Sequence, residues 1–339
     1  MGAVAFRPRS FIVTFLVTAI VSCLVLGLFN YLVNPLGWFA PRLVRPLAWG
    51  DQRIKVDLMK TAQPSEVLVL GSSRVSKLAP ADIRDLSGMR PFLAGVSSSR
   101  PEEQYAMLRY ALDDLHWPVK EIIYGIDLET LFYAGPPNED VASSPEVRQY
   151  VPREMWLPEV FARVKLLVSS YNLGLSAKAL RLDLTGSAPP SEVAFDADGY
   201  LHYITMEKQV AAGTFRLNAE GNLANYQERY NVAPSFDPQR KALFEQTLAL
   251  AQARGIKVRL FATPFHPALL AGLQQAPAFG PVRAAALPYL ERLADRYPNV
   301  TFHDFTEVAS FGGDPNAFFD GVHYRQENGR LMLAKLYQQ

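Results

Sequence analysis

Several features are scarce in this sequence, and each scarcity excludes a class of protein. The only cysteine is Cys23, so the chain can form neither an internal disulfide nor a thiolate metal site. Neither charge is in excess: 34 Lys and Arg residues stand against 33 Asp and Glu residues, which argues against a dedicated nucleic-acid binder. No repeat of fixed period is found, so a repeat architecture is not expected.

Long apolar runs are also scarce, with one exception near the N-terminus. Phe11 to Val33 is a run of 23 residues without a charge. At about 1.5 Å per residue it can cross a hydrocarbon core of roughly 30 Å, whereas a cleaved signal peptide has an apolar region of about 7–15 residues. Trp38 and Phe39 follow, as in an interfacial aromatic belt. We predict a transmembrane signal anchor over residues 1–34, with a buried core helix as the alternative.

The charges beside this run give a weak orientation signal. Arg7 and Arg9 precede it, but Arg42 and Arg45 follow it. The tail before the run is too short for a domain, so we predict a cytoplasmic N-terminus. The chain is then a single-pass protein of the inner (cytoplasmic) membrane, with everything after about residue 35 in the periplasm or extracellular space. Residues 35–63 are predicted to be a juxtamembrane connector.

The rest of the chain has the pattern of an α/β fold. The 339-residue chain is 49% apolar, enough for a substantial core. Short apolar runs alternate with helical patterns, which is typical of a doubly wound, mainly parallel sheet flanked by helices. The predicted strands are Glu66–Leu70, Pro91–Ala94, Lys120–Ile126, Lys257–Thr263 and Asn299–Asp304. We predict one α/β domain over 64–339, with an insertion or cap at about 134–234 whose only long helical pattern is Trp156–Leu182.

One helix start is well marked. Ser99 precedes Pro101, and Glu102 follows three residues after the serine. A serine cap, an early proline and a glutamate in the first turn are typical of a helix N-terminus. We therefore predict a helix with Ser99 as its N-cap.

Three short motifs follow predicted strands or precede the last helix, where an open parallel sheet binds its ligands. They are Gly71-Ser72-Ser73-Arg74, Gly125-Ile126-Asp127 and the segment FFDGVHY, which contains Asp320 and His323. Ligand-binding residues of a parallel sheet gather at the carboxyl ends of its strands. The sequence therefore places its candidate site at this edge.

Asp320 and His323 have a spacing with a chemical use. Residues three apart on a helical turn share a face, so the carboxylate can orient the imidazole. The imidazole can then act as general base for Ser73, whose hydroxyl is a poor nucleophile unaided. A serine at the start of a helix also has backbone N–H groups and the helix dipole directed at a developing oxyanion. We predict Ser73, His323 and Asp320 as a catalytic triad.

These blocks resemble those of the SGNH/GDSL hydrolase superfamily. The likeness covers roughly residues 64–128 and 237–339, in the family's order: GSSR, then Gly95, then Gly125-x-Asp127, then DGVH. With the anchor, the chain resembles the bacterial membrane-anchored, extracytoplasmic branch that includes alginate O-acetylation and teichoic-acid D-alanine-transfer proteins. The resemblance implies Ser73 as nucleophile, His323 as base, Asp320 as its orienter and the Gly95 N–H as an oxyanion donor.

One position departs from the family pattern. The third block of the family is Gly-x-Asn, with an asparagine that donates to the oxyanion, whereas this chain has Asp127. An ionised carboxylate only accepts hydrogen bonds. Three alternatives stay open: Asp127 is protonated, or it faces elsewhere, for instance towards Arg74, or catalysis is impaired. Arg74 itself could bind an anionic substrate or pair with Asp127.

The resemblance implies an enzyme that needs no cofactor. The expected activity is that of a serine esterase or O-acyltransferase, with acetyl as the expected group, acting on a cell-surface or exported polysaccharide through an acyl-Ser73 intermediate. The partners would be an acylated or acyl-accepting glycan and a membrane-bound O-acyltransferase or polysaccharide synthase, with no nucleic acid. The alternative is a non-catalytic SGNH-like scaffold of such a complex. His303 and Asp304 alternate on a strand without a suitably spaced third ligand, so no metal site is predicted.

Overall fold

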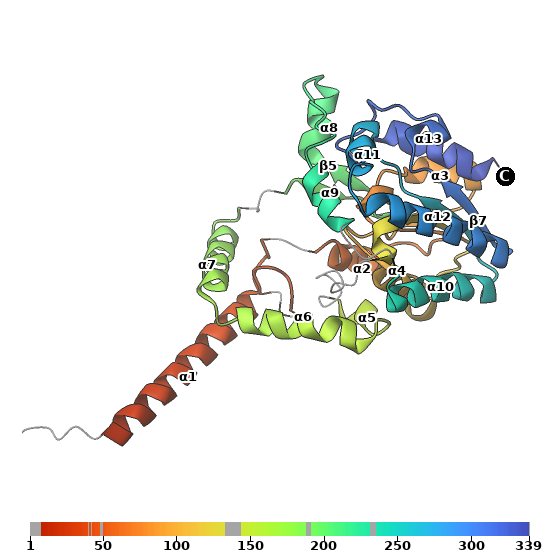
Figure 1. Cartoon of the computed structure of the whole chain (residues 1–339). Coiled ribbons are helices and arrows are strands. Elements are labelled where there is room, and N and C mark those ends of the chain that lie inside the picture. The colour runs from red at the N-terminus through yellow and green to blue at the C-terminus, as the bar shows by residue number, and fades with distance from the viewer. Residues whose placement is uncertain are drawn as a thin grey trace, which may run out of the picture. The chain divides into compact units, whose positions relative to one another are not determined.

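The computed structural model describes residues 8–39, 41, 43–47, 50–132, 144–187, 191–230 and 235–338. The chain divides into two compact units. The N-terminal unit contains residues 1–50 and 156–190, and the α/β unit contains residues 51–155 and 191–339 (Figure 1). Part of the expected insertion, residues 156–190, thus belongs with the N-terminal segment, whereas residues 191–230 belong with the sheet.

The N-terminal unit is built on one long helix. Helix α1 (Pro8–Val33) is followed in this unit by most of α6 (Arg153–Leu166) and by α7 (Ser170–Leu184), and α1 packs on α7. Asn30 joins the two segments: its Nδ2 donates to the carbonyl of Leu167 at 2.6 Å, and its Oδ1 accepts from Ser176 Oγ at 2.7 Å. The expected single helical pattern over 156–182 is therefore two helices.

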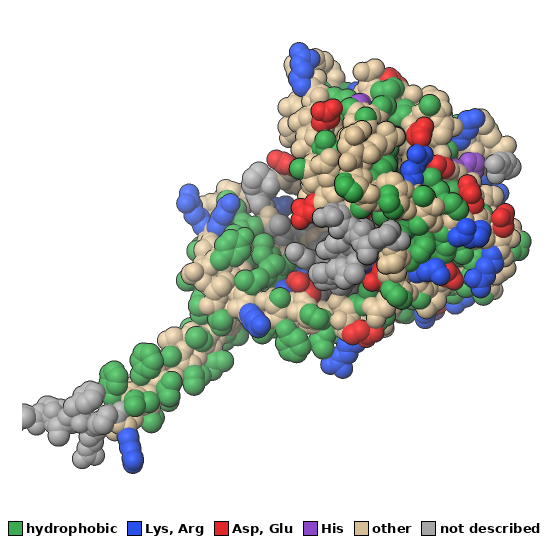
Figure 2. All heavy atoms as spheres, in the orientation of Figure 1, with side chains coloured by type: hydrophobic (Ala, Val, Ile, Leu, Met, Phe, Trp, Pro, Cys, Tyr) green, Lys and Arg blue, Asp and Glu red, His purple; other side chains and the backbone are tan. Residues whose placement is uncertain are grey.

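Most of α1 exposes apolar side chains. Phe15 and Leu24 are 62% and 66% exposed, and Figure 2 shows hydrophobic side chains along the helix. Among the described residues, α1 is the one helix that is long and apolar enough to cross a membrane, judged by length and composition.

The α/β unit contains the predicted sheet. Its five strands among the described residues are parallel and have the order β2-β1-β3-β6-β7. Their bounds are β1 Val67–Leu70, β2 Pro91–Leu93, β3 Glu121–Ile126, β6 Lys257–Ala262 and β7 Val300–Asp304. Consecutive apolar residues form these strands because helices cover both faces, so both sets of alternating side chains are buried. The prediction of an α/β fold with a parallel sheet flanked by helices is confirmed.

Helices pack in pairs over the sheet (Figure 1). α3 (Pro80–Ser87) packs on α13 (Gln326–Tyr337), and α4 (Pro101–Arg109) packs on α10 (Pro238–Ala253). Neighbouring strand residues separate the two pairs: Ile123 belongs to the core that contains α3 and α13, whereas the ring of Tyr124 lies 5.4 Å from that of Phe244 on α10. The sheet is therefore the middle of three layers.

The remaining helices and turns connect these layers. The other α-helices of the unit are α2 Asp51–Thr61, α5 Pro145–Arg148, α8 Ile204–Ala211, α9 Leu223–Arg229, α11 Pro267–Leu273 and α12 Phe279–Arg296. The short helical turns are η1 Ser73–Val75, η3 Leu128–Leu131 and η5 Val308–Phe311, and η2 Tyr110–Asp114 is a π-helical end of α4. An antiparallel hairpin joins β4 Val193–Phe195 to β5 Leu201–Tyr203.

One predicted helix start was wrong. The N-cap of α4 is Arg100, whose backbone N–H donates to the Glu103 carboxylate, and Pro101 is the first helical residue. Ser99 does not cap the helix, because its hydroxyl instead donates to the carbonyl of Gly71 at 2.7 Å. The serine thus ties the start of α4 to the end of β1.

Candidate active site

The structure brings Ser73, His323 and Asp320 together. Ser73 Oγ lies 2.8 Å from His323 Nε2, and His323 Nδ1 lies 2.7 Å from Asp320 Oδ2. An ionised carboxylate can only accept a hydrogen bond, so Nδ1 carries the ring proton and Nε2 is left to accept from the serine hydroxyl. Side chains 250 residues apart in the sequence thus form a hydrogen-bonded chain in the order of a serine triad.

Asp320 is held by a local turn rather than by a helix. Its Oδ1 accepts the backbone N–H groups of Val322 and His323, both at 2.8 Å, while Oδ2 faces the imidazole. Burial alone would raise the pKa of Asp320, but the bond to His323 and the two N–H donors lower it to about 2. The expectation that a helical turn would pair the two residues was wrong, although the pair itself forms.

Ser73 begins a short turn immediately beyond β1. Gly71, with φ of 145°, ends the strand, and Ser73 starts the three-residue 3₁₀ turn η1. A three-residue 3₁₀ turn therefore stands at Ser73 in place of the expected helix start. Ser72 caps the turn because its Oγ accepts the backbone N–H of Arg74 at 3.2 Å.

Three glycines surround the side chain of Val75 in this turn. A Cβ added at Gly71, Gly95 or Gly125 would lie 2.6, 2.5 or 2.4 Å from a methyl carbon of Val75. The glycines stand beyond β1, beyond β2 and within β3, so a larger residue at any of them would push the strand ends away from η1. The glycines of the three sequence blocks thus have a packing role beside any chemical one.

The backbone N–H groups of Ser73 and Gly95 are the candidate oxyanion donors. Within the described part of the chain, the N–H groups of Ser73 and Gly95 donate to no acceptor. A Cβ at Gly95 would lie 3.0 Å from the carbonyl oxygen of Ser72, so the Gly95 backbone lies close to the residue before Ser73. Backbone N–H groups without another acceptor are able to stabilise an oxyanion.

Asp127 faces Arg74 and Thr263. Its Oδ1 accepts from Thr263 Oγ1 at 2.7 Å and lies 3.5 Å from Arg74 Nε. Arg74 Nη1 also donates to Thr263 Oγ1 at 3.1 Å, and Nη2 donates to Glu129 Oε1 at 2.7 Å. The Tyr230 hydroxyl donates to Glu129 Oε2 at 2.8 Å. These five residues, Arg74, Asp127, Glu129, Thr263 and Tyr230, form what we call the Arg74 cluster.

The Arg74 cluster is buried. Arg74, Asp127 and Glu129 are 3%, 6% and 4% exposed, and the guanidinium carbon lies 5.1 Å from the ring centres of both Tyr226 and Phe265. Burial alone would lower the pKa of Arg74, but the two carboxylates raise it well above its usual value. The sequence predicted the pairing of Arg74 with Asp127 as one alternative. It did not predict the other three members, which come from separate elements and share no spacing.

The β4–β5 hairpin supplies an aromatic neighbour of the triad. The ring of Tyr203 lies 5.8 Å from that of His323 and 5.3 Å from that of Phe319, both at steep angles. The hairpin is attached to the edge of β2, where Leu93 N donates to the carbonyl of Asp198 at 2.8 Å. Sequence reasoning treated this segment as an insertion and missed its contact with the histidine.

Lys55 is a buried residue that hydrogen-bonds to the same hairpin. It is 1% exposed and lies in α2, and its Nζ donates to the carbonyls of Leu93, at 2.7 Å, and of Gly199. Burial lowers the pKa of Lys55 from 10.5 to about 7, although Asp51 and Asp198 favour the charged form. Residues 51–61, expected to be connector, are thus part of the α/β unit.

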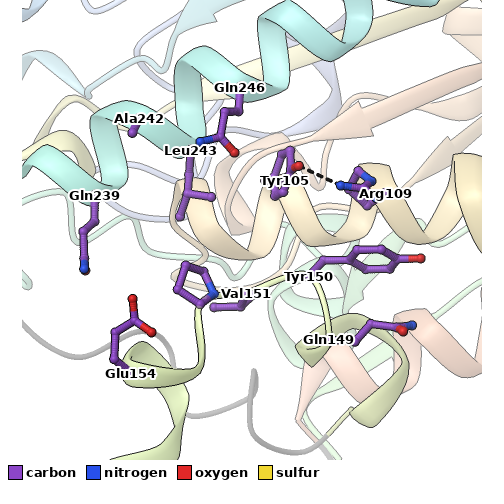
Figure 3. Close-up of a pocket in the computed structure, with 11 residues that line it drawn as sticks. Tyr105, Arg109, Gln149, Tyr150, Val151, Glu154, Gln239, Ala242, Leu243 and Gln246 are labelled. Carbon is purple, nitrogen blue, oxygen red and sulfur yellow. Dashed lines mark hydrogen bonds between the residues drawn. The ribbon is translucent and has the colours of Figure 1, made fainter.

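Two cavities lie apart from the hydroxyl of Ser73. One of about 590 Å³ is bordered by α4, α10 and the segment after α5, and its wall includes Tyr105 and Tyr150; there Arg109 donates to the Tyr105 hydroxyl at 2.8 Å (Figure 3). A second, of about 200 Å³, is lined by residues that include Asp127 and Glu129 of the Arg74 cluster. No triad residue lines either one.

The remaining histidines do not join the triad. His266 caps α11, because its Nδ1 accepts the N–H of Ala268 at 3.1 Å, and His202 lies between Asp196 and Glu207, 3.0 Å from each. Among the described residues, no group of three or more His, Cys, Asp or Glu side chains could hold a metal ion.

No protein-family model matches this sequence, and no curated protein matches it significantly.

Proposed function

We propose that the protein is a serine esterase or O-acyltransferase. The observation that carries the proposal is the chain from Ser73 Oγ to His323 Nε2 and from His323 Nδ1 to Asp320, at 2.8 and 2.7 Å. In this order Ser73 attacks the substrate, His323 moves the proton, and the ionised Asp320 stabilises the imidazolium.

The proposed reaction has two steps. Ser73 Oγ attacks the carbonyl carbon of an acyl ester while His323 Nε2 takes the hydroxyl proton, and the backbone N–H groups of Ser73 and Gly95 hold the oxyanion. The C–O bond to the alcohol then breaks, and His323 returns the proton to the leaving oxygen. In the second step a glycan hydroxyl or water attacks acyl-Ser73, again with His323 as base, which releases the acylated product and restores the serine.

The substrate and location are the finer part of the proposal. The order of the motifs on a parallel α/β sheet supports membership in the SGNH superfamily. The exposed apolar helix α1 supports a membrane anchor. We therefore propose an acetylated or acetyl-accepting polysaccharide as the substrate and the extracytoplasmic side of the membrane as the place of action.

A non-catalytic scaffold is the second candidate, and Asp127 favours it. The position where the family pattern has a donating asparagine is occupied here by an acceptor that faces Arg74. A protein that binds a glycan or a synthase without turnover would tolerate this change. The same experiment separates the two candidates.

The test is covalent labelling of the full chain in detergent by a fluorophosphonate probe, beside turnover of p-nitrophenyl acetate. Ser73→Ala should abolish labelling, and both Ser73→Ala and His323→Ala should reduce turnover by about 1,000-fold or more, the scale seen when a triad member is removed. Ser310→Ala, at an exposed serine, is the matched control and should change neither. A wild-type chain that neither labels nor turns over would refute the enzyme and leave the scaffold.

A further inference from the structure

We propose that Asp127 is a positioning residue that acts through Arg74 on the nucleophile turn, so that the oxyanion is held by the backbone N–H groups of Ser73 and Gly95. This inference rests on the proposed function. It assigns to Asp127 and Arg74 a role within the same site.

Arg74 is adjacent in the chain to the proposed nucleophile. It follows Ser73 directly and is the middle residue of η1. Its backbone N–H is held by Ser72 Oγ, and its guanidinium is held by Asp127, Glu129 and Thr263. Because both ends of Arg74 are fixed, the peptide between Ser73 and Arg74 has little freedom to rotate. The backbone on the C-terminal side of Ser73, and with it the position of the Ser73 side chain, is thereby constrained.

The Arg74 cluster contains three buried charged groups. One guanidinium faces two carboxylates, and all three groups are at most 6% exposed. A buried arginine needs carboxylate partners, because an uncompensated charge is costly away from water. Aromatic rings stand where water would otherwise solvate it: the guanidinium carbon lies 5.1 Å from the ring centres of Tyr226 and Phe265. Removing the charge of Asp127 would leave Glu129 as the single anionic partner.

Asp127 is not available as a hydrogen-bond donor to the oxyanion. Its Oδ1 accepts from Thr263 and faces Arg74, so this oxygen is occupied. An ionised carboxylate donates no hydrogen bond. The N–H groups of Ser73 and Gly95, in contrast, donate to no acceptor among the described residues. We therefore assign the binding of the oxyanion to the two N–H groups and the positioning of Arg74 to the Asp127 carboxylate.

The test is a double-mutant cycle on the full chain in detergent, with kcat and KM for p-nitrophenyl acetate as the readout. Asp127→Asn and Arg74→Gln should each lower kcat by about 10- to 100-fold with KM nearly unchanged, as expected for a misplaced reacting group. Their combination should lower kcat by no more than about threefold beyond the worse single variant, because both remove the same constraint.

The matched control is Glu102→Gln. Glu102 and Arg240 form another buried pair, 0% and 1% exposed, with Arg240 Nη2 donating to Glu102 Oε1 at 2.9 Å. This variant should lower the melting temperature but leave kcat unchanged at temperatures where it is folded. If it lowers kcat as much as Asp127→Asn, the effect is general destabilisation and the inference fails.

Two further outcomes would overturn the inference. An Asp127→Asn variant with equal or higher kcat would show an oxyanion donor at this position, as in the family pattern. Multiplicative losses in the double variant would show that the two residues act independently. Failure of the proposed function is distinguishable from both, because the wild-type chain would then show no Ser73-dependent labelling at all.

Discussion

The long helix of the N-terminal unit exposes its apolar side chains, whereas the strands of the α/β unit bury theirs. In the N-terminal unit, Leu24 of α1 is 66% exposed, whereas in the α/β unit Leu68 of β1 is fully buried. The α/β unit even buries a lysine, Lys55, at 1% exposure. Residue type alone does not decide burial here. A four-residue strand is covered on both faces by helices, whereas most of the 26-residue helix α1 exposes apolar side chains, and this helix is long and apolar enough to cross a membrane.

The largest expected effect is a difference in the free energy of unfolding between leucine-to-alanine substitutions in the two units. Leu68→Ala should destabilise the α/β unit by about 2–5 kcal/mol, because it leaves a cavity in the middle layer. Leu24→Ala should change the free energy of unfolding by less than about 0.5 kcal/mol. Urea unfolding of the full chain in detergent, followed by circular dichroism, measures both. Equal losses would contradict the idea that the exposed leucines of α1 have no protein core to fill.

A charged residue introduced into α1 tests whether this helix anchors the chain in a membrane. Val21→Lys should weaken membrane insertion by about 3 kcal/mol, the cost of a lysine at the centre of a spanning helix. The expected result is a loss of the chain from the alkali-washed membrane fraction, with unchanged fluorophosphonate labelling of Ser73.

The control for this change is Val21→Ile, which keeps the apolar surface and should stay in the membrane fraction. If Val21→Lys is retained as firmly as the control, α1 is not the anchor. If labelling is lost together with insertion, the chemistry of the α/β unit depends on the membrane.

The smallest expected effect, counted per pH unit, is a pH dependence set by Lys55. Its pKa is about 7 in the folded chain and near 10.5 when unfolded. Between these values the unfolded chain binds up to one more proton, so stability should rise with pH, by at most about 1.4 kcal/mol per pH unit. Chemical unfolding of the wild type between pH 7 and 10 measures this slope.

Lys55→Met provides the comparison for that slope. It should be less stable overall, because the carbonyls of Leu93 and Gly199 lose their donor, but its stability should lack the rise contributed by Lys55. The same slope in both proteins would show that other groups cause it.

The strands were predictable to within a residue or two because their signal is local. Consecutive apolar residues bounded by turns mark β1 and β3 without knowledge of their neighbours. The partnership of Ser73 with Asp320 and His323 was also predictable, since strand ends of a parallel sheet gather at one edge. The reason given for the Asp320–His323 pair was wrong, because a side-chain-capped turn and a helical turn can place residues three apart at the same distance.

The unpredicted parts depend on contacts between distant segments. Glu129, Thr263 and Tyr230 are single polar residues on three different elements, and only the folded sheet brings them to Arg74. Tyr203 reaches His323 because its hairpin pairs with the edge of β2 through backbone groups, which carry no sequence signal. The segment that contains this hairpin was predicted to be an insertion because backbone contacts cannot be recognised in the sequence.

The packing of three glycines around Val75 has a consequence for how relatives of this chain could be recognised. A protein that lost its activity would be free to replace Ser73 or His323, yet its strand ends would still have to close around the same isopropyl group. Glycines at 71, 95 and 125 with a β-branched residue at 75 are therefore a signature of the architecture, independent of turnover. The triad, in contrast, would be a signature of the proposed reaction, and a relative that keeps the glycines and Val75 without the triad would share the architecture alone.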